Sequence, residues 1–184
     1  IDASDGRFRD IWDLRSPLDC HVSGMVFRET SIDYTNPTIC SMDSVEVQNV
    51  SDYYYSDANG NCILDDLTYN DISSRLRLRN KFFVTVHPST TTIKLADSIT
   101  LSEDGNVLIE YDNDVSNSAN VFYHINKHLI GLNYLSEFML NDLRITTGVP
   151  MTEFPNFGVF SPSANLIRIR ADKSKYSHVI RHEL

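Results

Sequence analysis

Alternating hydrophobic and polar positions dominate the first half of the chain. Apolar residues recur at about every second position in residues 20–28, 44–50 and 74–79, and residues 81–86 form the strongest strand-like run. Such alternation is typical of half-buried β-strands. Turn signals rich in Asn, Asp, Gly and Pro separate these stretches, and no helical period interrupts them. We therefore predict a small antiparallel β-sandwich domain over residues 17–92.

The second half of the chain carries the only long helical pattern. Between Ser118 and Asn141, apolar residues recur every three or four positions, as on one face of an amphipathic helix. The stripe consists of Val121, Ile125, Leu129, Leu132, Leu135 and Met139, widened by Phe122, Ile130 and Phe138. Asn117 or Ser118 would cap the start of this helix. Gly131 inside it costs about 1 kcal/mol relative to Ala and would permit close packing.

The remaining segments complete a mixed architecture. Polar residues 1–16 are predicted to form an N-terminal arm or linker, and a second linker is predicted at residues 87–92. Strand-like runs at residues 144–146 and 165–170 flank a loop rich in Pro and Phe, which runs from Pro150 to Pro162, and a last helix starts near Ser174. The sequence therefore predicts a mixed fold, in which the all-β sandwich is followed by an α+β segment at residues 93–184.

One turn invites a calcium interpretation. The segment Asp57-Ala58-Asn59-Gly60-Asn61 presents oxygen ligands at alternate positions. Its glycine is at the fourth position rather than the sixth, and Thr68 stands where an EF-hand needs a bidentate Glu. A hairpin turn in which Asn59-Gly60 supplies positive φ explains the segment better.

Composition excludes several classes of function. Sixteen basic and 25 acidic residues give a net charge of −9. Because no Lys/Arg cluster with interleaved aromatic residues occurs, nucleic acid and anionic membrane surfaces are poor candidate partners. No apolar run approaches the roughly 18–20 residues that cross a bilayer, so no membrane span is expected.

Cysteine usage leaves two alternatives open. Cys20, Cys40 and Cys62 fit no C-x-x-C metal or redox pattern. In an oxidising compartment two of the three would form a disulfide, whereas in a cytosolic fold all three would be buried thiols. A composition rich in aromatic residues, Ser, Thr, Asn and Asp favours an extracellular or secreted protein. The sequon Asn49-Val50-Ser51 adds little to this, because such triplets are common by chance.

The candidate chemistry lies in His182-Glu183-Leu184, within an amphipathic segment at residues 176–184. A His-Glu pair on a helix is the first half of H-E-x-x-H, in which two histidines bind zinc and the Glu acts as general base. The second histidine would fall two residues beyond Leu184, so we expect a chain truncated inside this motif. Two other histidine pairs, His124 with His128 and His178 with His182, have helical i, i+4 spacing without the internal Glu and are weaker metal candidates.

Two sequence stretches, about 55 residues apart, follow one another in the order found in a known group of enzymes. They are Ser118-Ala119-Asn120-Val121-Phe122-Tyr123-His124, which opens the long helix, and Tyr176-Ser177-His178-Val179-Ile180-Arg181-His182-Glu183. With the β segment between them, they resemble the region leading into the catalytic helix of secreted gluzincin-type zinc metallopeptidases, the fungalysin and thermolysin group. The likeness covers roughly residues 106–184.

The front of the chain resembles a different module, an Ig- or transthyretin-like domain of the carboxypeptidase regulatory type. This likeness is carried by Val22-Ser23-Gly24-Met25-Val26, Val45-Glu46-Val47, Ser56-Asp57-Ala58-Asn59-Gly60 and the expected hairpin from Arg75 to Val84.

The peptidase resemblance implies roles for individual residues. His182 would be the first zinc ligand, Glu183 the base that activates zinc-bound water, and the strand at residues 165–170 the sheet strand beside the cleft, where a peptide or protein substrate pairs. A zinc site needs three or four protein ligands. The second histidine, the distal carboxylate and the C-terminal lobe are absent, so zinc is expected in the intact parent and neither zinc nor activity in this fragment.

Two further expectations follow. The surface that the missing lobe would cover favours self-association. The alternative function is a non-enzymatic extracellular module, such as an adhesin, surface-layer or filament subunit, in which the pair His182-Glu183 has arisen by chance.

Overall fold

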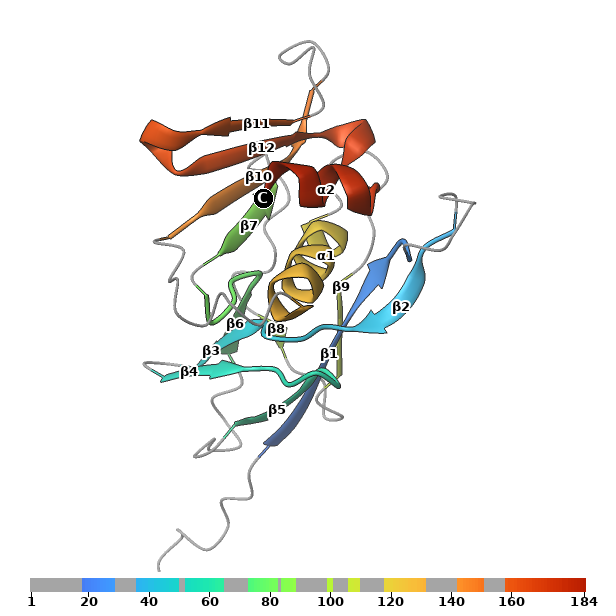
Figure 1. Cartoon of the computed structure of the whole chain (residues 1–184). Coiled ribbons are helices and arrows are strands. Elements are labelled where there is room, and N and C mark those ends of the chain that lie inside the picture. Colours follow the sequence, from blue (N-terminus) through green and yellow to red (C-terminus); the bar gives the residue numbers. More distant parts are fainter. Residues whose placement is uncertain are drawn as a thin grey trace, which may run out of the picture.

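The computed structural model describes residues 18–28, 36–49, 52–64, 73–82, 84–88, 99–100, 106–109, 118–131, 142–150 and 158–184. The predicted N-terminal arm, the end of the linker after Pro88 and the long helix beyond Gly131 lie outside these residues. Within them the fold is mixed, mostly strands in three small four-stranded sheets, with two α-helices towards the C-terminal half (Figure 1). The prediction of a mixed fold is confirmed at this level.

The first sheet is built around β1 (Leu18–Val26). β2 (Thr38–Ser41) and β5 (Asn61–Leu64) pair with it in antiparallel orientation, and β9 (Asn106–Ile109) pairs with it in parallel. Alternate residues of β1 face the core, and Val22 and Val26 there are fully buried. The parallel pairing with β9 is a feature that the alternating pattern did not predict.

The second sheet is antiparallel. Its order is β4 (Asp52–Tyr55), β3 (Glu46–Asn49), β6 (Ser73–Arg77) and β8 (Ile99–Thr100). Alternation again decides which side chains are inside, because Val47 of β3 is buried opposite buried Leu76 of β6.

The third sheet has the order β11 (Gly158–Ser161), β12 (Leu166–Arg170), β10 (Arg144–Val149) and β7 (Thr85–Pro88). β7, β10 and β12 are parallel, whereas β11 is antiparallel and stands at the edge. Short 3-10 turns, Pro162–Ala164 and Ala171–Lys173, follow β11 and β12. Two sequence expectations change here: β11 lies inside the predicted Pro- and Phe-rich loop, and residues 87–88 belong to a strand rather than a linker.

The three sheets do not separate at the predicted boundary near residue 92. Strands that follow this boundary, β9, β8 and β10 to β12, join all three sheets and pair with strands that precede it. The buried hydrophobic residues also form one cluster that draws on the three sheets and both helices. Among the described residues, the two predicted segments therefore share sheets and a core.

Helix α1 (Ser118–Gly131) lies in the middle of this core, between the β10–β12 layer and the strands of the first half (Figure 1). Val121, Phe122 and Ile125 are fully buried, as the predicted apolar stripe requires. Polar residues of the same helix tie it to distant backbone. Asn120 Oδ1 accepts a hydrogen bond from Phe27 N at 2.8 Å, and His124 Nε2 donates one to Phe27 O at 2.8 Å.

Three local predictions had different outcomes. Gly60 has φ +81°, as a turn using Asn59-Gly60 requires, and Asp57 Oδ1 accepts hydrogen bonds from the N–H groups of Asn59 and Asn61. The predicted hairpin is wrong, however, because β4 and β5 on either side of this turn pair in different sheets. Close packing at Gly131 is also wrong, since an added Cβ there would meet no atom within 4 Å.

Candidate functional site

The His-Glu pair lies on α2 (Ser177–Glu183), the helix predicted from the end of the sequence. Val179 and Ile180 anchor it, because both are buried and Ile180 belongs to the common core. The helix lies beside α1 and next to β11 (Figure 1). The amphipathic pattern of this helix thus has a simple cause: Val179 and Ile180 face the core, whereas His178, Arg181 and His182 are exposed.

The turn before α2 is held by α1. Asn120 Nδ2 donates a hydrogen bond to Ser174 O at 2.9 Å, and Ser174 itself is fully buried. Ser174 Oγ donates a second hydrogen bond, to Ala171 O at 2.8 Å. The start of the candidate helix is therefore positioned by a buried side chain more than fifty residues earlier in the sequence.

His182 and Glu183 have different surroundings. His182 is exposed, whereas the side chain of Glu183 is half-buried against β11. A Cβ added to Gly158 would lie 2.6 Å from Glu183 Cδ, 2.7 Å from Cγ and 2.9 Å from Oε1. The glycine therefore leaves the space that the carboxylate occupies beside the edge strand.

The strand beside this carboxylate is not the one that the sequence indicated. Residues 165–170 were expected to border a substrate cleft, but β12 is an inner strand that pairs with β11 on one side and β10 on the other. The edge strand is β11, whose Phe160 is exposed. The only sequence signal for it was the short apolar run Phe157-Gly158-Val159-Phe160 in a loop-like context.

An ion pair closes the end of β12, shortly before α2. Arg170 is buried, and its Nη2 donates a hydrogen bond to Asp172 Oδ2 at 2.8 Å. This hydrogen bond from Arg170 lowers the pKa of the Asp172 carboxyl below its ordinary value of 3.8. It also raises the pKa of the Arg170 guanidinium. Both groups stay charged at neutral pH and fix the route from the sheet to the helix.

The other histidine pairs do not assemble a metal site. His124 is buried, and its Nε2 already donates a hydrogen bond to the backbone oxygen of Phe27, directly after β1. His128 is only half-buried. His178 and His182 are both exposed on α2, one turn apart. In the part of the chain that the structure describes, no three His, Cys, Asp or Glu side chains come together as metal ligands.

The residues present therefore do not fit a complete zinc site. His182 supplies one imidazole, and Glu183 stands next to it as a carboxylate. Tetrahedral zinc in proteins takes three or four protein ligands. Further ligands would have to come from outside the described residues.

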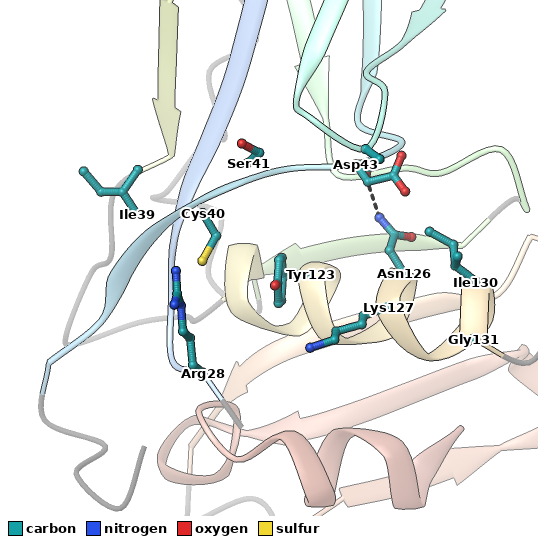
Figure 2. Close-up of a pocket in the computed structure, with 11 residues that line it drawn as sticks. Arg28, Ile39, Cys40, Ser41, Asp43, Tyr123, Asn126, Lys127, Ile130 and Gly131 are labelled. Carbon is teal, nitrogen blue, oxygen red and sulfur yellow. Dashed lines mark hydrogen bonds between the residues drawn. The ribbon is translucent and has the colours of Figure 1, made fainter. Parts of the chain in front are cut away.

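A separate cavity lies between β2 and α1 (Figure 2). Its volume is about 690 Å³, and its lining includes the cationic side chains of Arg28 and Lys127 together with Asp43, Cys40 and Tyr123. Two of its lining residues are joined by a hydrogen bond, which Asn126 Nδ2 donates to Asp43 O at 2.7 Å (Figure 2). None of the lining residues belongs to α2 or β11, so this cavity and the His182–Glu183 site are distinct.

No helix of the described residues is long and apolar enough to cross a membrane. Comparisons of the chain with protein-family models, curated proteins and solved structures found no match. The candidate chemistry consequently rests on the chain's own residues and their arrangement.

Proposed function

We propose that this chain is part of a secreted zinc-dependent endopeptidase, in which His182 is the first zinc ligand and Glu183 the general base. The observation that carries the proposal is the position of the Glu183 carboxylate, half-buried against Gly158 of the edge strand β11 while His182 next to it is exposed. A general base has to stand within hydrogen-bond reach of a reacting group that is itself held in place.

The edge strand supplies the means of holding a substrate. β11 ends the order of the third sheet, and an edge strand offers unpaired N–H and C=O groups to an extended peptide. A peptide paired with β11 would run past Gly158 and therefore past Glu183. This arrangement supports a peptide or protein substrate and moves the proposed substrate strand from β12 to β11.

The proposal extends to the fold. The order α1, β10 to β12, α2 supports a likeness to the N-terminal lobe of a zinc metallopeptidase. The earlier strands would correspond to the Ig- or transthyretin-like module, although they share sheets with later strands. Residues 1–184 alone are proposed to be inactive, because one histidine does not hold a zinc ion.

A second candidate is a non-enzymatic extracellular module that binds another protein. It is favoured by exposed large apolar side chains on two strands that both pair with β1, since Ile39 of β2 is 60% exposed and Ile63 of β5 is 58% exposed. Phe160 and Leu184, both exposed beside α2, also support self-association through the surface near the candidate site. Light scattering after size exclusion over a concentration series tests this; a strict monomer at high concentration contradicts it.

The peptidase proposal is tested on the coding sequence and then on the protein. We expect a histidine two residues after Leu184 and a Glu some twenty or more residues later, as the resemblance implies. In the protein extended to include them, Glu183→Gln should lower peptide cleavage by about 10²–10⁴-fold and leave bound zinc unchanged. His182→Ala should lose the zinc.

His178→Ala is the matched control, because this histidine is exposed on the same helix face one turn earlier. It should leave zinc content and cleavage rate within about twofold, as expected of an exposed side chain outside the site. A different residue at the expected histidine position, or an unchanged cleavage rate in Glu183→Gln, would overturn the proposal in favour of the binding module.

A further inference from the structure

Two of the three cysteines lie opposite one another across a strand pair. In the antiparallel pairing of β1 with β5, Cys20 is the direct partner of Cys62. Directly opposite residues in an antiparallel pair have Cα atoms about 4.5–5.5 Å apart and side chains on the same face. A disulfide needs Cα atoms about 4.4–6.8 Å apart, so the register of these strands meets its geometric requirement.

The third cysteine is excluded by the same sheet. Cys40 of β2 is the partner of Gly24, which lies four residues farther along β1 than Cys20. At a rise of about 3.3 Å per residue, four residues correspond to roughly 13 Å, well beyond the reach of a disulfide. Cys40 is also only half-buried and lines the cavity between β2 and α1, whereas Cys20 and Cys62 are 2% and 3% exposed.

The two buried thiols already interact. All three cysteines are free thiols in the structure. The neighbouring thiol of Cys62 lowers the pKa of Cys20, and the neighbouring thiol of Cys20 together with burial raises the pKa of Cys62. The two thiols therefore face one another in the fold.

We propose that Cys20 and Cys62 are a disulfide-forming site, which a small disulfide such as oxidised glutathione closes during folding in an oxidising compartment, and that Cys40 stays a free thiol. One of the two thiolates attacks one sulfur of the oxidant, which forms a mixed disulfide and releases one thiol. The other thiolate then attacks the protein sulfur of this mixed disulfide and releases the second thiol. The pair loses two electrons and two protons, and both are carried away by the two released thiols.

The timing follows from burial. With both sulfurs almost inaccessible in the fold, the oxidant reaches them before β1 and β5 have closed, and the native register then selects this pairing over the two others. Such a cross-link is a feature of secreted proteins. The inference does not rest on the peptidase proposal. Cys20 and Cys62 lie in the first third of the chain, far in sequence from His182 and Glu183, and the cross-link would hold for either candidate function.

The test uses the 184-residue chain, unfolded under reducing conditions and refolded in a buffer of reduced and oxidised glutathione. Remaining thiols are alkylated, the protein is digested without reduction, and the peptides are identified by mass spectrometry. We expect a peptide linking Cys20 to Cys62 and an alkylated Cys40. The oxidised form should melt roughly 5–15 °C higher than the reduced one.

Variants separate the possible pairings. Cys40→Ser should form the same link in the same yield, and Cys62→Ser should lose it and leave two alkylated thiols. If Cys62→Ser fails to refold, the unmodified chain and Cys40→Ser still decide the question. A link that involves Cys40, or three alkylated cysteines in the refolded chain, overturns the inference.

Discussion

Replacing Gly158 by Ala tests whether the edge strand positions the candidate base. Carbon atoms in contact lie about 3.5–4.0 Å apart. The new Cβ would be 2.6 Å from Glu183 Cδ, so the carboxylate has to retreat by about 1 Å. Gly158 is not among the glycines with positive φ, and the atoms it would displace belong to a flexible side chain at the end of α2. The fold should therefore tolerate the change at a cost below about 1 kcal/mol.

The effect on chemistry should be much larger. A displacement of about 1 Å in a catalytic group can lower a rate by roughly 10²-fold. We expect Gly158→Ala in the extended protein to lower kcat by about that factor, with zinc content unchanged, because the three atoms nearest to the added Cβ all belong to Glu183. In the 184-residue chain, the side-chain resonances of Glu183 should shift in NMR spectra while the urea midpoint changes little.

Gly131→Ala is the matched control. No atom lies within 4 Å of a Cβ at that position, and it is distant in sequence from the candidate site. Its expected effect is a gain of up to about 1 kcal/mol in the free energy of unfolding, with kcat unchanged. The reasoning is refuted if Gly158→Ala retains full kcat in a cleaving enzyme, or if the Glu183 resonances do not move.

Two further predictions concern the supports of α2. Asn120→Ala removes the buried side chain that bonds to Phe27 N and Ser174 O, so it should lower the free energy of unfolding by about 2–5 kcal/mol in urea titrations. Lys127→Ala, at an exposed position on the same helix, should change it by less than about 0.5 kcal/mol. Equal effects of the two substitutions would contradict this account. Because the folded pKa of Asp172 is depressed below 3.8, its ion pair with Arg170 stabilises the fold above that pH and is lost as the pH falls through the lower folded value. The stability difference between the wild type and Asp172→Asn should therefore be present near neutral pH and shrink as the pH falls below 3.8, and a difference that stays constant on acidification would argue against it.

Much of the local structure could be predicted from hydrophobic periods. The alternation at residues 20–28 and 44–50 predicted β1 and β3, and the three-four spacing after Ser118 predicted α1. The run at residues 81–86 predicted a strand over its whole length, and this was wrong, because β7 begins only at Thr85. Consecutive apolar residues there reflect burial of Val84 and Val86 beside the core rather than a strand along the whole run.

The candidate site was only half predictable. His182 and Glu183 were visible because a two-residue motif on an amphipathic segment is a local signal. β11 was not, since four residues between two prolines are too short to show a period, and nothing in the sequence indicates that Gly158 faces Glu183. That contact joins residues 25 positions apart through the packing of α2 on the sheet.

By itself, the sequence determined the periods, and hence where several of the strands and both helices form, together with the positions of its histidines, carboxylates and thiols. Only the tertiary structure decided which strands became neighbours: that β9 lies beside β1, that β11 and not β12 forms the edge next to Glu183, and that Cys20 faces Cys62 and not Cys40. The physical reason is the distance along the sequence over which each signal acts. A period reports which side of an element is buried, whereas pairing between distant segments depends on how the whole chain closes around its core.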